Sequence, residues 1–350
     1  MDMPWGFPDF DAHEGLHFID DPKSGLRAII AVHSTHLGPA AGGARYWHYA
    51  DSAEALTDAL RLSRGMSYKN AMAGLPLGGG KSVLLAGEDS HKSPELLAAF
   101  GKAVDGLSGR YVTAEDVGMN VTDMVEVRRQ TRFVAGLPAE GAGQVGGDPG
   151  PHTSLGVFLG LKAAVRRALG KDTVEGLHIA IQGAGSVATG VAMHACAEGA
   201  RLSIADVDGK KARKLADTVE GTVVDPDDIL FLEADVVSPN ALGAIFTEET
   251  INRLNTQIVA GGANNQLSTP ADGERLQARG VLYAPDYVIN AGGIINVCTE
   301  YLGDGDASLV RERIEGIPQR LEQIWSESAS SGRDPAAVAD SMAQRLIGRG

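Results

Sequence analysis

The chain has 350 residues, of which 43% are hydrophobic and 22% are charged, and its formal net charge is −14. This composition is typical of a globular protein, and the acidic balance argues against a nucleic-acid-binding protein, which needs clustered Lys and Arg. The start of the chain, MDMPWGFPDFDAHEG, is acidic, and the sequence has no apolar run long enough for a membrane helix. We therefore expect a cytoplasmic protein with no nucleic-acid or membrane partner and, at this length, two domains.

A strand followed by a long helix is predicted early in the chain. Residues 26–34, LRAIIAVHS, are mostly apolar and predict a buried strand. Asp51 and Glu54 form a possible capping box for a helix over residues 51–71. Lys69 follows Met66 by three residues and so lies on the same side of this helix. The expected buried stripe comprises Leu56, Ala59, Leu60, Ser63 and Met66.

Patterns typical of metal sites are weak in this sequence. His33 and His36 are close together, but their flanks predict a strand that runs into a turn. Cys196 and Cys298 are far apart in apolar surroundings, which is typical of buried reduced thiols. We therefore expect no metal site.

The stretch GLPLGGGKSVLL, residues 74–85, permits three interpretations of Lys81. A phosphate-binding loop would need a glycine at position 75, where this chain has Leu75, and a helix after the lysine. The residues that follow, SVLLAG, instead predict a short strand. A tight glycine turn with a solvated lysine and a catalytic lysine both remain possible from this stretch alone.

A segment rich in glycine and proline, GLPAEGAGQVGGDPGPH at residues 136–152, is the best candidate for an interdomain hinge. Strands and helices alternate after it. We expect a first domain over residues 1–140, a second over 141–329, and a terminal segment, 330–350, that packs back on the first.

The second domain begins with a dinucleotide-binding pattern. In LHIAIQGAGSVATG a β-branched strand runs into Gly183, Gly185 and Ala188, and a helix follows. Gly183 makes the turn, Gly185 admits the pyrophosphate, and Ala188 allows close packing of helix on strand. Asp206 ends the next strand, where its carboxylate would bind ribose hydroxyls and repel a 2′-phosphate. NAD is therefore favoured, although Lys210 and other nearby cations leave NADP open. Later edges from strand to loop, in GTVVD, ADVVSP, QIVAGGANN and VLYAPDYVINAGG, indicate a parallel α/β sheet.

Several blocks of the sequence together resemble the glutamate/leucine/phenylalanine/valine dehydrogenase superfamily, with the leucine branch most similar. The blocks are LGPAAGGARYW, RGMSYKNAMAGLPLGGGKSVL, YVTAEDVGMN, GPHTSLGVFLGLKAA, GAGSVATG, AGGANNQL and YVINAGGIINV. The resemblance implies an α/β protein with an N-terminal α/β domain for substrate binding and oligomerisation. It also implies a doubly wound Rossmann domain for NAD, a cleft between the two domains, and a homo-oligomer.

The resemblance also implies the reaction and its residues. The family oxidatively deaminates an L-amino acid to a 2-oxo acid and ammonium, with NAD as the oxidant. Lys81 matches the catalytic base, Asp116 matches the acid that exchanges protons with the amine and water, and Lys69 matches the lysine that binds the substrate carboxylate. Further matches at the substrate are Gly42, Gly43, Ala41, Met66, Asn264, Ile294 and Val297. Matches at the cofactor are Gly183, Gly185, Ser186, Val187, Ala188, Asp206, Thr153, Asn240, Asn264 and Asn290.

Residues of the matched substrate pocket favour an apolar amino acid. Ala41 stands where glutamate dehydrogenases have a lysine for the distal carboxylate, and Val297 replaces their pocket serine. Ile294 adds to an apolar wall, so a glutamate side chain would lose its solvation without gaining a partner. We expect leucine or another branched-chain substrate, with phenylalanine or valine dehydrogenase as the alternative. Two more distant alternatives are a catalytically silent NAD-binding regulator and a nucleoside-triphosphatase that uses the GGGKS stretch.

Overall fold

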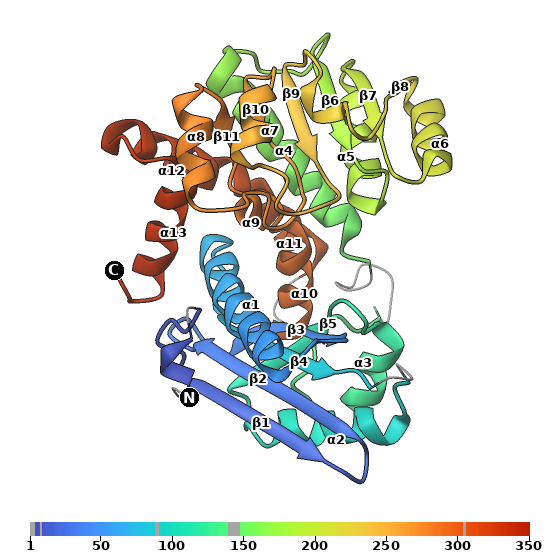
Figure 1. Ribbon diagram of the computed structural model, residues 1–350, viewed down its shortest axis with the longest axis vertical. Coiled ribbons are helices and arrows are strands. Elements are labelled where there is room, and N and C mark those ends of the chain that lie inside the picture. Colours follow the sequence, from blue (N-terminus) through green and yellow to red (C-terminus); the bar gives the residue numbers. More distant parts are fainter. Residues whose placement is uncertain (1–3, 8, 88–90, 139–147, 304–305) are drawn as a thin grey trace. The chain divides into compact units, whose positions relative to one another are not determined.

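The computed structural model describes residues 4–7, 9–87, 91–138, 148–303 and 306–350 (Figure 1). The chain divides into two compact units. The first unit takes the described residues of 1–147, 296–310 and 343–350, and the second unit takes those of 148–295 and 311–342. Most of the expected hinge, residues 139–147, lies outside the described residues.

The first unit contains a mixed sheet whose described strands have the order β1-β2-β4-β3-β5. The strands are β1 (Gly15–Asp21), β2 (Leu26–Ser34), β3 (Ala40–Trp47), β4 (Gly78–Leu85) and β5 (Tyr111–Glu115). β2 is antiparallel to β1 and to β4, whereas β3 is parallel to β4 and to β5. The strand predicted over residues 26–34 is confirmed with the same bounds.

Helices cover both faces of this sheet (Figure 1). Side chains alternate between the faces of a strand, so Ile29 and Val83 pack with α1 (Ser52–Met72) on one face. On the other face, Ile30 and Leu84 pack with α2 (Pro94–Asp105) and α3 (Val121–Arg128). A short 3-10 helix, η1 (Pro4–Gly6), precedes β1. The central strands β2 and β4 are therefore covered on both faces, and the face under α1 carries the candidate site.

The predicted helix after Asp51 is confirmed as α1, with one local difference. The Asp51 side chain accepts hydrogen bonds from the backbone N of Ala53 and of Glu54, as an N-cap does. Glu54 does not complete the expected capping box, because its carboxylate accepts from the backbone N of Ala50 instead. The predicted stripe is buried except at Met66, which is only partly buried.

Two neighbouring histidines, the buried His33 and the partly buried His13, join α1, β2 and the segment after α13 (Pro335–Leu346). The His33 ring is completely buried; its Nδ1 lies 2.7 Å from Ser67 Oγ, and Arg349 Nη1 donates to its Nε2 over 2.7 Å. His13 Nε2 lies 3.0 Å from Ser63 Oγ. Burial lowers the pKa of His33 to about 3 and the pKa of His13 to about 4. Both rings are therefore neutral in the folded protein at neutral pH.

These two histidines predict that mild acid destabilises the protein. Below pH 6.5 the unfolded chain takes up protons on both rings while the folded chain does not, so protons favour unfolding. Stability is therefore lost as the pH falls from about 6.5, with a loss at pH 5 of about 2 kcal/mol for the buried His33 and somewhat less for the partly exposed His13. Urea unfolding at pH 5.0 and pH 7.0 measures the loss, and His13→Asn should reduce it by roughly half. Equal unfolding free energies at the two pH values would contradict this account.

The second unit contains a parallel sheet whose described strands have the order β11-β10-β9-β6-β7-β8. The strands are β6 (His178–Gln182), β7 (Arg201–Ala205), β8 (Thr222–Val223), β9 (Val236–Pro239), β10 (Ile258–Val259) and β11 (Leu282–Tyr283). All pairings are parallel, and the strand order reverses between β6 and β9. This is the order of the doubly wound dinucleotide-binding fold, so the predicted two-domain α/β fold is confirmed.

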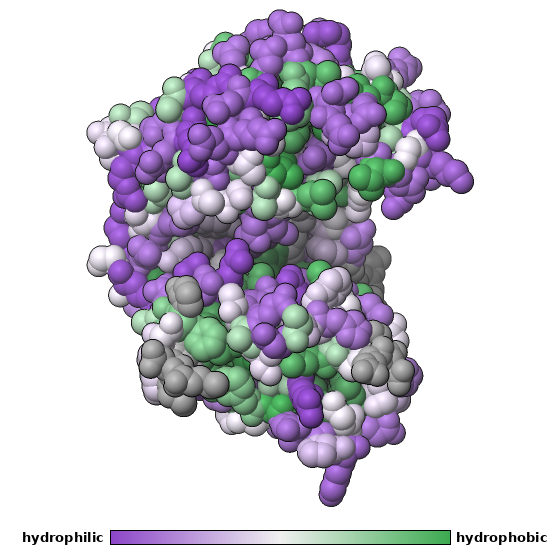
Figure 2. All heavy atoms as spheres, viewed as in Figure 1, coloured by the Kyte–Doolittle hydropathy of each residue, from purple (hydrophilic) through white to green (hydrophobic). Residues whose placement is uncertain are grey.

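Helices alternate with these strands, as βαβ units require. They are α4 (Gly150–Leu169), α5 (Ser186–Ala197), α6 (Gly209–Val219), η2 (Ile229–Phe231), α7 (Glu248–Arg253), α8 (Ala271–Ala278), α9 (Asp286–Ile289) and α12 (Ile317–Ser331). α10 (Gly292–Leu302), α11 (Ala307–Glu315) and α13 contain residues of both units. Hydrophilic residues predominate on the face of the second unit seen in Figure 2. Within the described part of the chain, no helix is long and apolar enough to cross a membrane.

Candidate active site

Lys81 lies in the middle of the first unit's sheet. β4 runs from Gly78 through Lys81 to Leu85, and the lysine side chain is only 5% exposed. It lies on the same strand face as Val83, two residues later, and so on the face that α1 covers. The glycine-turn interpretation is therefore wrong, because the lysine is neither solvated nor in a turn. The phosphate-loop interpretation is wrong as well, since the strand continues where that loop needs a helix.

The glycines before Lys81 are explained by close approach of neighbouring segments. A side-chain carbon on Gly79 would lie 2.0 Å from the backbone N of Ser67, on α1. A side-chain carbon on Gly80 would lie 2.7 Å from the Tyr111 ring, on β5. Glycine thus lets α1 lie against β4 where any side chain would hold the two apart.

Lys81 forms an ion pair with Asp116, which follows β5. Lys81 Nζ lies 2.8 Å from Asp116 Oδ2. Gly43, on the intervening strand β3, makes this approach possible, because a side-chain carbon there would lie 2.8 Å from the Asp116 Cβ. The structure therefore brings together the two residues predicted as base and acid.

Charge and burial shift both groups of this pair. Burial lowers the pKa of the Lys81 ammonium, and the Arg45 guanidinium adds to this, while Asp116 opposes it. Burial would raise the pKa of the Asp116 carboxyl, but the charges of Lys81 and Arg45 outweigh it and lower that pKa. The two groups titrate as a coupled pair. The pair therefore combines an ionised carboxylate with a lysine that loses its proton more readily than usual.

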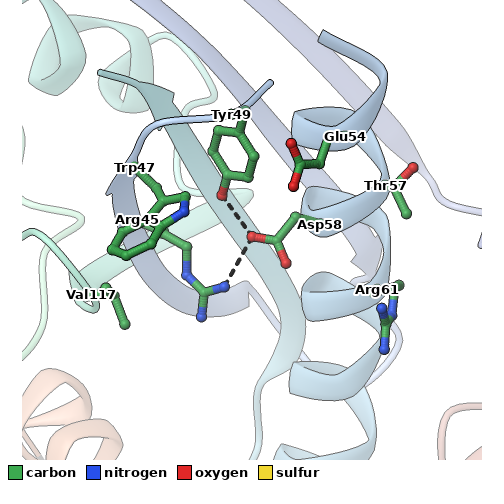
Figure 3. Close-up of a pocket in the computed structure, with 8 residues that line it drawn as sticks. All are labelled: Arg45, Trp47, Tyr49, Glu54, Thr57, Asp58, Arg61 and Val117. Carbon is green, nitrogen blue, oxygen red and sulfur yellow. Dashed lines mark hydrogen bonds and ion pairs between the residues drawn. The ribbon is translucent and has the colours of Figure 1, made fainter. Parts of the chain in front are cut away.

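Sequence reasoning missed three polar neighbours of this pair (Figure 3). Arg45 Nε donates to Asp116 Oδ2 over 2.9 Å, and Arg45 Nη1 donates to Asp58 Oδ2 over 2.9 Å. Tyr49 OH donates to the same Asp58 oxygen over 2.6 Å. Arg45 belongs to the LGPAAGGARYW block, so the sequence already contained a reason to consider it a site residue. No feature of the sequence near Arg45 identifies Asp58 as its partner.

Several predicted substrate residues gather near Lys81 in the first unit. Gly42 faces Met66, since a side-chain carbon on Gly42 would lie 3.2 Å from the Met66 Cγ. Lys69 is partly buried and follows Met66 on the same side of α1. Ala41 is buried, and its backbone O accepts a hydrogen bond from Asn70. Gly42 on β3 thus lies against Met66 on α1, and Lys69 lies on the same side of that helix.

Ile294 and Val297, the other predicted pocket residues, lie three residues apart on α10. Both are partly buried. Their spacing puts the two apolar side chains on one side of the helix.

The glycine fingerprint has the geometry of a dinucleotide loop. Gly183 has a φ of 102°, in the left-handed region that favours glycine. An added carbon at Gly185 would meet no atom within 4 Å, so there is open space beside the backbone. Ala188 is buried against the sheet, and α5 begins without a side-chain cap. The uncapped N–H groups of α5 and the space at Gly185 suit a bound phosphate.

Two other predicted cofactor residues adjoin this loop. Asp206 Oδ2 accepts from the backbone N of Ala184 over 2.7 Å, which fixes the carboxylate beside the fingerprint. Asn240 follows β9, and its backbone N donates to Gln182 O at the point where the strand order reverses. Ser186 and Val187 begin α5 and are exposed and partly buried, respectively.

Three further predicted residues of the second unit are all polar, namely Asn264, Asn290 and Thr153. Asn290 Nδ2 donates to Asn264 Oδ1 over 2.8 Å. The Asn290 Oδ1 atom is buried and has no hydrogen-bond partner among the described residues. Thr153 Oγ1 donates to the backbone O of Pro149. A buried amide oxygen without a partner is the kind of group that a ligand satisfies.

Clusters of metal-ligating side chains are not found in the part of the chain that the structure describes. His33, in the HSTH stretch, contacts Ser67, Asp11 and Arg349 instead.

Known proteins resemble this chain over nearly its whole length. Residues 13–133 match the family described as Glu/Leu/Phe/Val dehydrogenase, dimerisation domain, and residues 148–342 match Glutamate/Leucine/Phenylalanine/Valine dehydrogenase. The chain is 44% identical to a leucine dehydrogenase of Bacillus subtilis, over 96% of this chain and 92% of that protein. It is 43% identical to a valine dehydrogenase of Streptomyces albus, over 97% and 93% of the two chains. The solved L-tryptophan dehydrogenase from Nostoc punctiforme superposes with a TM-score of 0.86 at 39% identity, covering 96% of both chains.

Proposed function

Because this chain belongs to the glutamate/leucine/phenylalanine/valine dehydrogenase family, we propose that it oxidatively deaminates an apolar L-amino acid, with NAD as the oxidant. Leucine or another branched-chain amino acid is the favoured substrate, and the products are the 2-oxo acid and ammonium. The observation that carries the proposal is the ion pair between the buried Lys81 and the partly buried Asp116, with Lys81 Nζ 2.8 Å from Asp116 Oδ2. The enzyme class, an amino acid dehydrogenase, follows from the family itself.

The residues of the first unit would carry the acid–base steps. Lys69 binds the substrate carboxylate, since a buried carboxylate without a metal needs a cation. Lys81, once deprotonated, takes a proton from water as the water attacks the iminium carbon of the oxidised substrate. Asp116 exchanges protons with the substrate nitrogen, which leaves as ammonium. The reaction consumes one water and is reversible.

The loop after β6 supports NAD as the cofactor. The open space at Gly185 and the uncapped start of α5 suit a pyrophosphate, and the Asp206 carboxylate beside them suits a ribose diol. The same carboxylate would repel the 2′-phosphate of NADP. When bound, NAD supplies the acceptor for the hydride that leaves the substrate α-carbon. The buried Asn290 Oδ1, which lacks a partner among the described residues, would gain one from the ligand.

The residues predicted to line the side-chain pocket support an apolar substrate. Ala41 offers no charge to a distal carboxylate, and Ile294 and Val297 present apolar side chains from one side of α10. The named relatives act on leucine, valine and tryptophan, so family membership alone does not choose among apolar substrates. One methylene changes specificity by only about 1 to 3 kcal/mol, which keeps valine and phenylalanine as alternatives.

A panel of L-amino acids tests the proposal. With NAD, the initial rate should be highest on leucine or another branched-chain amino acid and should fall at least about tenfold on glutamate, whose carboxylate would be buried without a partner. Replacing NAD by NADP should lower the rate. Equal rates on glutamate and leucine would contradict the substrate class, and NAD binding without any turnover would favour a silent regulator.

The expected homo-oligomer stays a prediction. Phe18 is 63% exposed on β1, the edge strand of the first unit's sheet, and apolar residues reach the surface of that unit in Figure 2. An exposed apolar side chain on a sheet edge is consistent with contact between subunits.

A further inference from the structure

Arg45 lies beside the candidate acid–base pair and lines a solvent pocket. Its neighbours on β3, Ala44 and Tyr46, pack on the α2 face, so Arg45 points to the α1 face that also holds Lys81. It lines a pocket of about 440 Å³ in the first unit (Figure 3), whereas Asp116 does not line it. Its side chain is 24% exposed. Arg45 therefore contacts Asp116 from the side of this solvent pocket.

The Arg45 guanidinium is held at two ends. Its Nε and the Lys81 Nζ reach the same oxygen, Asp116 Oδ2, over 2.9 and 2.8 Å. Its Nη1 reaches Asp58 Oδ2 over 2.9 Å. A planar guanidinium that spans two carboxylates fixes its own orientation and theirs, which a lysine cannot do.

Tyr49 completes the support of this arginine. Its hydroxyl donates to Asp58 Oδ2 over 2.6 Å. Burial raises the pKa of the Tyr49 phenol, so the hydroxyl stays protonated and continues to donate. Asp58 is thus held by Tyr49 on one side and holds Arg45 on the other.

We propose that Arg45 is a positioning residue for the deamination proposed above, because it fixes the Asp116 carboxylate against Lys81 and keeps a positive charge beside the pair. This inference rests on the proposed function. With both cations on Oδ2, the other oxygen of Asp116 is the one available for proton exchange with the substrate nitrogen. Asp58, held by Tyr49, fixes the other end of the guanidinium.

The charges around Lys81 determine whether the loss of a neighbour favours the protonated or the neutral lysine. They come from Arg45 on β3, Asp58 on α1 and Asp116 after β5, and α1 also carries Lys69. The positive charge of Arg45 makes the Lys81 ammonium less favourable, while the two carboxylates make it more favourable. Removing Arg45 must therefore favour the protonated lysine, and removing Asp58 must favour the neutral one.

Substitution of Arg45 with a neutral residue tests the proposal through the pH profile of kcat. In Arg45→Gln the rising limb, which reports deprotonation of the base, should move up by about one pH unit, and kcat at neutral pH should fall about tenfold or more. Arg45→Lys retains the charge but cannot span two carboxylates. The rising limb of its pH profile should therefore stay at the wild-type pH while kcat falls. Arg61→Gln removes a charge that lines the same pocket but is 60% exposed and contacts Asp9, and it should leave the profile unchanged.

An unmoved limb in folded Arg45→Gln, or equal shifts in Arg45→Gln and Arg45→Lys, would overturn the proposal. Circular dichroism and thermal melting establish that each variant is folded. If Arg45→Gln does not fold, Asp58→Asn provides the test, and its limb should move to lower pH; no shift or the opposite shift would overturn the proposal. Failure of the proposed function is distinguishable, because the wild type itself would then show no turnover on any amino acid.

Discussion

Lys81→Ala should lower kcat by roughly two to four orders of magnitude, the usual contribution of a positioned acid–base group. The side chain is 5% exposed and pairs with Asp116, so its nitrogen is largely shielded from bulk solvent. Burial lowers the pKa of Lys81, and a base acts only when deprotonated. The wild-type rate should therefore rise with pH through that pKa, and the variant should lose this limb.

Three measurements make the Lys81 prediction specific. NAD binding, followed by calorimetry, should stay near the wild-type value, because the fingerprint belongs to the other unit. Small primary amines should restore part of the lost rate if a lysine nitrogen is what is missing. Lys162→Ala removes another paired lysine, 2.6 Å from Glu198, and should keep the wild-type kcat. A folded Lys81→Ala variant with wild-type kcat on its best substrate would refute the catalytic role.

The dinucleotide unit could be predicted from the sequence because its signals are local. A strand, Gly183 with its left-handed φ, and the start of α5 follow one another within a few residues. Asp206 directly follows the next strand, and its contact with Ala184 spans only 22 residues. In such βαβ units the order along the chain largely dictates the order in space.

The strand with three glycines could not be predicted in the same way. Glycine has low strand propensity, so GGGK by itself favours a turn. Its place in a strand depends on α1, whose Ser67 would be 2.0 Å from a side-chain carbon on Gly79. That contact exists only once the helix has packed on the sheet. Tertiary packing here overrides local propensity.

Local sequence patterns also could not predict the charged residues that contact the acid–base pair. Arg45 meets Asp116 across 71 residues of sequence and Asp58 across 13. Arg349 reaches the buried His33 across 316 residues. The family resemblance, which is confirmed, indicated the acid and the base; its LGPAAGGARYW block includes Arg45 but does not pair it with Asp58 or Asp116. Such partners become visible only when β3, α1 and the loop after β5 are assembled.

Lys69→Ala should act mainly on substrate binding, in contrast to Lys81→Ala. Lys69 follows Met66 on the side of α1 that faces Gly42, where a substrate carboxylate would meet both the ammonium and the glycine backbone. Loss of one partner of a buried charge pair costs about 2 to 5 kcal/mol, which corresponds to a rise in KM of about 30-fold or more. The kcat should fall as well if the carboxylate contact holds the α-hydrogen in line for transfer.

Two fragments of leucine separate this effect from a general disturbance of the pocket. 4-Methylpentanoate retains the carboxylate and lacks the amine, whereas 3-methylbutylamine retains the amine and lacks the carboxylate. As competitive inhibitors, the acid should bind the Lys69→Ala variant much more weakly than the wild type, and the amine should bind both about equally. Lys69→Arg should recover only part of the affinity for the acid, because a guanidinium presents its charge in a different geometry. If Lys69→Ala weakens the amine as much as the acid, Lys69 supports the shape of the pocket and the carboxylate must be bound elsewhere.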